Sequence, residues 1–334
     1  MPERSPDAAP PPTSEEPLRR PVPPGEAIVR TLAADEATRD VPPDAISLRL
    51  AAVEAGPETT PERRGLGVAA WLAVVWLLLL GAVALTVPVL PVPDPTVDAE
   101  PALARQGPSL SHPFGVDGAG RDVFASVLWG TRVSLFIAVA SIVAGFVAGG
   151  VIGIVAGYFK GRIGGVLGSA MDVFLAFPQL ILALSIVTFL GRTVFNVTLG
   201  LAIVATPVLA RIARASTLSW SEREFVLAAR AQGARHLRIM VREILPNVLP
   251  AMFSIALLGV AVVIVAEGGL AIIGAGVKPD IITWGNVIVR GQGELRDASH
   301  IVLAPSLVIF LTVLSLNYLG DVVRARFDVR ESAL

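Results

Sequence analysis

Long apolar runs without a charged residue dominate the chain. About 20 apolar residues in a helix cross the hydrocarbon core of a bilayer, which is about 30 Å thick. Six runs reach or approach that length, at residues 65–92, 133–159, 173–190, 193–210, 247–266 and 301–320. The pattern therefore predicts an all-α integral membrane protein with about six transmembrane helices.

The segments between and beyond these runs divide the chain into regions. Residues 1–64 are rich in Pro, Ala and charged residues, and such a segment buries too little apolar surface to fold. The first apolar run begins too late and is too long for a signal peptide. We expect a disordered cytoplasmic tail 1–64, a first transmembrane helix 65–93, an outer loop 94–130, a core 131–321 containing an inner loop 215–250, and a cytoplasmic C-terminal tail 322–334.

The distribution of Lys and Arg predicts the orientation. If the N-terminus is placed inside, the inner segments hold twice as many of these residues as the outer segments. Cytoplasmic loops of multi-pass membrane proteins carry an excess of Lys and Arg. We therefore expect both chain termini on the cytoplasmic side.

The amino-acid composition limits the kinds of chemical site that this chain can form. Charged residues make up 16% of the chain, against about 25% in a soluble domain. There is no cysteine, the three histidines are far apart, and no paired acids lie in the apolar runs, so we expect neither a metal site nor a catalytic set. Neither lysine, Lys160 or Lys278, follows a glycine, so any ATP would be bound by another chain with a Walker A loop. The net charge of −1 indicates no nucleic-acid partner.

Small residues form a stripe in the second apolar run. Gly145, Gly149, Gly153 and Gly157 are each four residues apart and share one face of a helix. Such stripes let helix backbones approach closely in lipid. Two interpretations stay open: close packing within this chain, or a seam against a partner subunit or along a path that must slide.

Glu267 is an acid inside an otherwise apolar stretch. An ionisable group at membrane depth is costly and usually faces a cavity or a partner. It is a candidate gating or cavity residue. The alternative is an acid at the outer end of a span, held by helix ends.

The inner loop carries a distinctive pattern. Residues 221–232 are strong helix formers, Gly233 permits a sharp turn, and a second short helix should follow and end at Pro246. That second helix has an apolar stripe, Leu237, Met240, Val241 and Ile244, and a basic face, Arg235, Arg238 and Arg242. The pattern suits docking into a groove of a soluble partner, or a helix lying on anionic lipid headgroups.

Within this loop the residues Ala228 and Ala229, then Gly233, then Pro246 resemble the "EAA" loop of permease subunits in bacterial ABC importers. In that family the loop forms a coupling helix that inserts into a cleft on an ATPase subunit. Residues 228–234 and 244–247 more specifically resemble the dipeptide/oligopeptide branch, in its C-type subunit.

Other stretches resemble the same branch, so that the resemblance covers about residues 67–332. They are residues 112–117, 120–123 and 130–135, residues 284–286, and residues 317–321 with Arg324 and 328–330. Three positions depart from the pattern: Leu227 replaces the family's acid, Glu243 replaces a common His, and Val329 replaces a common Pro.

The resemblance implies a type I ABC importer permease fold and a set of residues that couple to the ATPase. These are Ala228, Ala229, Gly233, Leu237, Met240, Val241, Leu245 and Pro246. It implies no cofactor on this chain, with ATP and Mg²⁺ on the partner ATPase. The implied partners are a second homologous permease subunit, two ATPase subunits or domains, an extracytoplasmic substrate-binding protein, and membrane lipid.

The implied function is translocation of dipeptides or oligopeptides across the cell membrane, without enzyme activity on this chain. The same branch resembles carriers of nickel complexes and other small solutes, which remain alternatives. An ion-driven secondary transporter would need acids or histidines in several spans. Glu267 is nearly alone in this respect, which disfavours that class.

Overall fold

The computed structural model describes residues 67–331, where the regular elements are helices apart from one isolated β-bridge between Val116 and Asp122. The chain divides into two units, residues 1–64 and 65–334, and the described helices belong to the second. The expected N-terminal tail lies outside the described residues.

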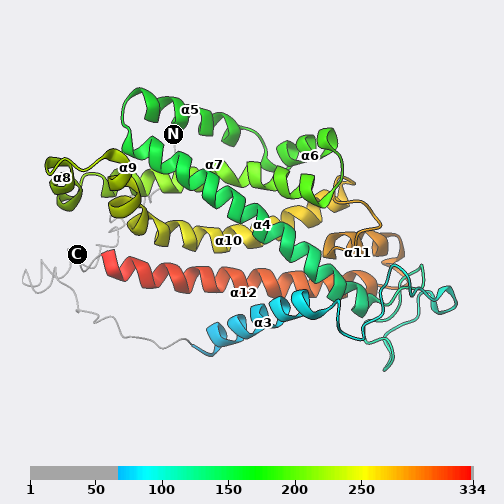
Figure 1. Cartoon of the computed structure of the whole chain (residues 1–334). Helices are drawn as coiled ribbons and strands as arrows, with labels where there is room; N and C mark the ends of the chain where they lie inside the picture. Colours follow the sequence, from blue (N-terminus) through cyan, green and yellow to red (C-terminus); the bar gives the residue numbers. More distant parts are fainter. Residues whose placement is uncertain (1–66, 332–334) are drawn as a thin grey trace, which may run out of the picture. The chain divides into compact units, whose positions relative to one another are not determined.

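Among the described residues, five helices are long and apolar enough to cross a membrane, and a bent pair can form a sixth span. The five are α3 Val68–Thr86, α4 Val123–Tyr158, α7 Val194–Trp220, α10 Leu245–Ile272 and α12 His300–Glu331 (Figure 1). The bent pair is α5 Arg162–Ala176 and α6 Gln179–Leu190. The shorter elements are η1 Pro101–Leu103, α8 Glu224–Ala231, α9 His236–Arg238, η2 Ile239–Ile244, α11 Trp284–Gly291 and η3 Gln292–Glu294. The predicted all-α membrane fold is confirmed.

The hydropathy pattern predicts one span over the apolar run 173–190, but the structure shows that this run is not one straight helix. It breaks between α5 and α6, whose axes differ by 88°. Pro178 explains the break, because a proline disfavours the helical conformation of the residue before it, and Phe177 is extended with ψ 139°. The 12 residues of α6 rise only about 18 Å, too short to cross the core alone.

Helix α4 begins at Val123, inside the segment 94–130 that was expected to be an outer loop. Asp122 caps it, because one carboxylate oxygen accepts the backbone N–H of Ala125 at 3.0 Å. The other oxygen is 2.8 Å from Nδ1 of His112. At the other end of the chain, α12 continues to Glu331, so most of the expected C-terminal tail is helical.

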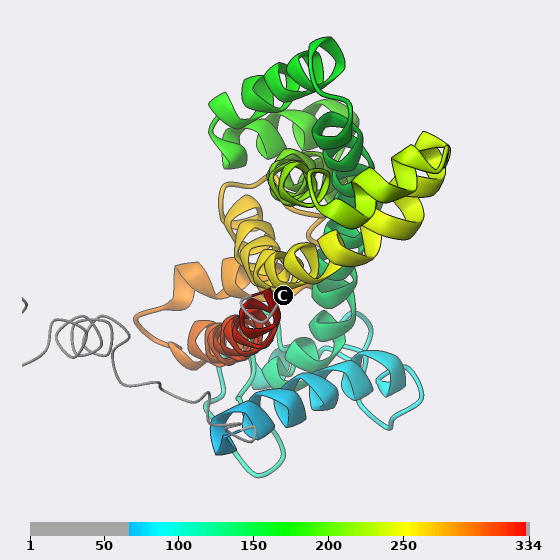
Figure 2. The ribbon, with the colours of Figure 1, turned by 90° about the vertical axis from the view of Figure 1, so that its left-hand side faces the viewer.

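The helices follow one another in a row that α4 crosses. Figure 2 shows α5 and α6 beside α7, followed by α10, α12 and α3. Helix α4 packs against α7, α10, α12 and α3 in turn, so it ties the row together.

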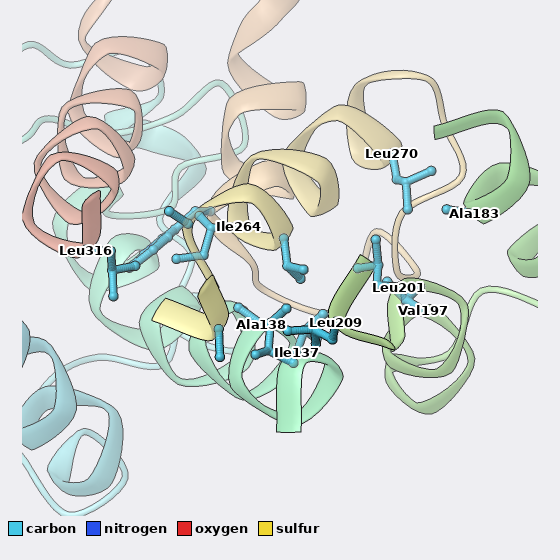
Figure 3. Packing of buried hydrophobic residues seen from close by; sticks show 14 of the residues in the cluster. Ile137, Ala138, Ala183, Val197, Leu201, Leu209, Ile264, Leu270 and Leu316 are labelled. Atoms are coloured by element: carbon cyan, nitrogen blue, oxygen red, sulfur yellow. The ribbon is translucent and has the colours of Figure 1, made fainter. Parts of the chain in front are cut away.

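One core joins these helices. Figure 3 shows Ile137 and Ala138 of α4 near Leu209 of α7, and Ile264 of α10 lies in the same cluster. Trp284 opens α11 and is fully buried. Its indole N–H donates to the carbonyl of Val127 at 3.1 Å, and its backbone N–H donates to Ser134 Oγ at 3.0 Å. Helix α11 is therefore fixed against α4.

The glycine stripe of α4 lies against α7 of the same chain. A Cβ atom built on Gly149 would lie 2.7 Å from the carbonyl oxygen of Thr206, and one on Gly153 would lie 2.3 Å from that of Ala210. Such separations are shorter than real contacts allow, so only glycine permits this approach. Gly157 faces α7 in the same way, while a Cβ atom on Gly145 would make a tight contact of 3.2 Å with Cβ of Ala205. This surface is occupied within the chain, which favours the first of the two interpretations of the stripe.

Candidate functional site

The segment that follows α7 leaves the bundle and projects past the ends of the spans. In Figure 1, α8 lies beyond the ends of α4 and α7, at the end of the bundle where α12 finishes. Aromatic contacts join the end of α7 to the start of α8. The ring centroids of Trp220 and Phe225 are 6.2 Å apart, and the Arg223 guanidinium lies 5.3 Å from the Trp220 ring centroid.

The turn at Gly233 is a Schellman motif. Gly233 is left-handed, with φ 77°, and its N–H donates to the Arg230 carbonyl at 3.0 Å. The N–H of Ala234 donates to the Ala229 carbonyl at 3.1 Å. In this motif the residues at the positions of Ala229 and Ala234 also make an apolar contact, and both are partly buried against the core. The spacing of the alanine and the glycine in the sequence therefore has a structural cause.

The second helix of the loop does not end at Pro246, and that prediction was wrong. Helix α9 continues through η2, a π-helical segment, into α10, and residues 236–272 form one apolar span. Pro246 lies at the start of α10, directly after η2, so its missing N–H falls where the hydrogen-bond pattern of the continuous helix changes from π-helical to α-helical. The segment after Gly233 is therefore continuous with a span.

The predicted coupling residues fall into two groups. Ala228, Ala229 and Gly233 belong to α8 and its turn, where Ala228 and Gly233 are exposed. The other group lies on the continuous helix. Four of its members face α4 across an apolar groove of about 370 Å³, namely Leu237, Met240, Val241 and Leu245, while Pro246 is exposed.

Tyr158, which sequence reasoning missed, fastens the segment to α4. It is the last residue of α4 and only 6% exposed. Its hydroxyl is hydrogen-bonded to Nδ1 of His236 at 2.8 Å, and the Arg230 guanidinium lies 5.5 Å from its ring centroid. Tyr158 therefore contacts both α8 and α9. The sequence carries no signal for this contact, because 78 positions separate Tyr158 from His236.

A second, exposed link joins the same elements. Lys160, which follows α4, pairs with Glu222, which precedes α8. The hydrogen bond and positive charge of Lys160 hold the pKa of Glu222 below its ordinary value. Both groups are more than half exposed, so solvent screens this pair more than it screens the partly buried contact between Tyr158 and His236.

Glu267 lies near the C-terminal end of α10 and is 2% exposed. Its carboxylate is close to Thr283 and Gly285, at the start of α11. Helix N-termini stabilise negative charge. Oε1 has no hydrogen-bond partner among the described residues. The geometry matches an acid held by a helix end. Glu267 lines neither the apolar groove beside α4 nor the cavity between α6, α7 and α10.

A larger apolar cavity of about 490 Å³ lies between α6, α7 and α10. Gln179, the first residue after the break at Pro178, is the one polar side chain among its lining residues. No group of acidic or histidine side chains that could hold a metal ion occurs among residues 67–325, whose side chains the structure describes.

Comparisons with known proteins identify the family. The family model described as "Binding-protein-dependent transport system inner membrane component" matches residues 149–332. The dipeptide transport system permease protein DppC of Alkalihalophilus pseudofirmus is 34% identical over 77% of this chain and 85% of its own. The glutathione transport system permease protein GsiD of Shigella flexneri serotype 5b is 38% identical over 67% of this chain and 74% of its own.

A solved structure shares the fold. The MetNI methionine ABC transporter, in inward-facing conformations, aligns with a TM-score of 0.51 at 20% identity, over 60% of this chain and 95% of that chain. The matches to family, relatives and fold agree with the multi-pass helical architecture. The chain therefore belongs to the family of binding-protein-dependent transport system inner membrane components, as a permease subunit of an ABC importer.

Proposed function

We propose that this permease subunit translocates dipeptides or oligopeptides, and that α8 with its turn at Gly233 transmits force from a separate ATPase. The observation that carries the proposal is the double attachment of this projecting segment. It is fastened to α4 through Tyr158, and it is continuous with α10 through η2.

The exposed surface of α8 suits a protein partner. Phe225 is 40% exposed and Leu227 is 49% exposed, next to Ala228. Apolar side chains gathered on an exposed helix mark an interaction surface. Leu227 stands where the family usually has an acid, so we expect the partner's cleft to be more apolar at this point.

The attachment explains how a push on α8 would reach the spans. Movement of α8 would pull on Tyr158 and hence on α4, which is locked to α7 through the glycine stripe. Movement of the turn would also shift the start of α10. Packed elements of this kind move as rigid bodies between discrete states. The cavity between α6, α7 and α10 would change shape as these helices move.

The partners follow from the same reasoning. The sequence has no glycine–lysine pair and hence no Walker A loop. ATP and Mg²⁺ would therefore be bound by two ATPase subunits or domains, beside a second permease subunit and an external binding protein. In this arrangement α8 and both termini lie in the cytoplasm, in agreement with the excess of Lys and Arg on that side.

Peptide as the substrate is supported by the relatives, one named for dipeptide transport and one for glutathione transport. Uptake of labelled dipeptide, glutathione and nickel by a deletion strain carrying this chain tests the choice. We expect peptide uptake to be restored and nickel uptake to stay at background. If only nickel uptake were restored, the assignment of peptide as the substrate would be refuted, while the assignment of the chain as a permease subunit would stand.

The coupling role is tested by replacing Gly233 with Val. The added side chain has open space, but the left-handed backbone, φ 77°, disfavours it, at a cost of about 1–2 kcal/mol. We expect an inserted, assembled complex whose substrate-stimulated ATP hydrolysis falls at least about tenfold, because that strain shifts the turn.

Gly161 provides the matched control. It has φ 80°, open space around its Cβ position, and lies between α4 and α5 at the same end of the bundle. With ψ −135° its backbone lies outside the left-handed helical region, so Gly161→Val should carry at least as much strain while stimulation is retained. Retained stimulation in Gly233→Val, or equal loss in both variants, would refute the coupling role of this turn.

A further inference from the structure

An apolar groove runs along the membrane-spanning surface at the inner end of the bundle. It lies between the last turns of α4 and the helix that continues from α9 into α10. Its exposed members include Val147 and Val151, each 60% exposed, and Val241, 50% exposed. All of its lining residues are apolar. Nothing in the described part of the chain covers these side chains.

The length of the groove matches half of a bilayer. Its α4 residues span 146–155, and at 1.5 Å per residue this is about 13 Å along the helix. Half of the hydrocarbon core is about 15 Å. The groove ends close to Tyr158, where α4 ends, so it lies within one leaflet.

Unpaired positive charge flanks the end of the groove nearest the aqueous phase. Arg238 and Arg242 directly follow the groove residues Leu237 and Val241, and Arg235 lies one turn earlier. Among the side chains that the structure describes, in residues 67–325, none of these three arginines has an ion-pair partner. Glu243 is the one acid in the same turn. The local charge is therefore positive.

We infer that this groove binds an anionic phospholipid, with an acyl chain along α4 and the phosphate at Arg238 and Arg242. An apolar channel at hydrocarbon depth with cations at its interfacial end matches the two parts of such a lipid. Arginine matches phosphate oxygens with two parallel N–H donors, and anionic leaflets attract basic segments next to membrane spans. A soluble protein partner would reach the arginines but not the apolar channel. The inference does not depend on the substrate or on the coupling role of α8.

The absence of cysteine from the chain makes a direct test possible. The full-length chain with Val151→Cys, labelled with bimane, is placed in nanodiscs containing either brominated phosphatidylglycerol or brominated phosphatidylcholine. We expect quenching to favour the anionic lipid by about threefold or more, because the basic segment enriches it locally. The matched control is Val143→Cys, 55% exposed on the same face of α4 but outside the groove. It should show no preference.

Charge removal completes the test. In the Val151→Cys background, Arg238→Gln together with Arg242→Gln should abolish the preference while quenching by phosphatidylcholine persists. A preference that survives this change, or that is equal at position 143, overturns the inference. A label at 151 that neither lipid quenches, while the label at 143 is quenched, also overturns it, because protein such as a second permease subunit then covers the groove. Neither result depends on ATP hydrolysis or transport, so failure here leaves the proposed function standing.

Discussion

At the scale of single residues, Tyr158 is the contact on which the proposed transmission from α8 depends. Its hydroxyl bond to His236 is partly buried, since Tyr158 is 6% exposed while His236 is an exposed residue, and such a hydrogen bond contributes about 1 kcal/mol. Tyr158→Phe keeps the ring beneath Arg230 and removes the bond alone. We expect the number of substrate molecules transported per ATP hydrolysed to fall by about fivefold, since about 1 kcal/mol of coupling is lost. Transport and hydrolysis measured together in proteoliposomes give this ratio.

Two control variants separate coupling from general damage. Tyr318→Phe changes the other tyrosine of the chain, which is 39% exposed on α12, and should leave the ratio unchanged. Lys160→Gln removes the exposed pair with Glu222, and solvent screening predicts little effect. If Lys160→Gln lowered the ratio and Tyr158→Phe did not, the exposed pair would be the true connection.

At the scale of elements, the packing of α4 on α7 depends on the absence of side chains. In Gly153→Ala the new methyl group would meet the carbonyl of Ala210 at 2.3 Å, and such overpacking costs about 1–3 kcal/mol. Gly165→Ala in α5, where nothing lies within 4 Å, should instead stabilise its helix by up to about 1 kcal/mol. Thermal unfolding of the purified variants should therefore show opposite shifts of Tm. A lower Tm in both variants would mean that any added methyl group destabilises the protein, and the close contact between Gly153 and Ala210 would not be the specific cause.

The elements also show what the sequence can predict. Hydropathy located the spans, because crossing a bilayer requires long apolar helices whatever their packing. It could not show that the run 173–190 bends by 88° at Pro178, since prolines also occur in continuous spans, as Pro207 does in α7. Nor could it show that Pro246 begins a long helix, because the same residue suits a helix end or a first turn. Whether Pro246 ends a helix or lies at the start of one depends on η2, and its π-helical form has no clear sequence pattern.

The candidate site was predictable only in its local part. The turn at Gly233 follows from residues four apart, Ala229 and Gly233, which the sequence displays together. The direction of the Leu237 and Val241 stripe depends on where α4 lies, which is a tertiary fact. Tyr158 and His236 meet only because α4 and α9 end at the same side of the bundle. Contacts between segments that are distant in the sequence could therefore not be predicted from the sequence.

At the scale of the whole molecule, the two ends of the bundle are built differently. The loop before α4 is held by His112 and Asp122 and by Arg105 with Glu294, 3.6 Å apart. The opposite end holds α8 and its exposed apolar side chains. Helix α4 connects the two ends with 36 residues, about 54 Å, which is longer than a complete bilayer of about 40–45 Å. The loop and α8 must then face different compartments.

This separation yields a topology prediction that the cysteine-free chain makes simple to measure. Leu110 lies in the loop before α4 and is fully exposed, and Ala228 is exposed on α8. A membrane-impermeant maleimide should label Leu110→Cys in intact cells, and it should label Ala228→Cys only after the membrane is permeabilised. The excess of Lys and Arg on the α8 side is the physical reason. The reverse labelling would place α8 outside the cell, where no ATPase could reach it, and would exclude force transmission through Gly233 even if the fold is correct.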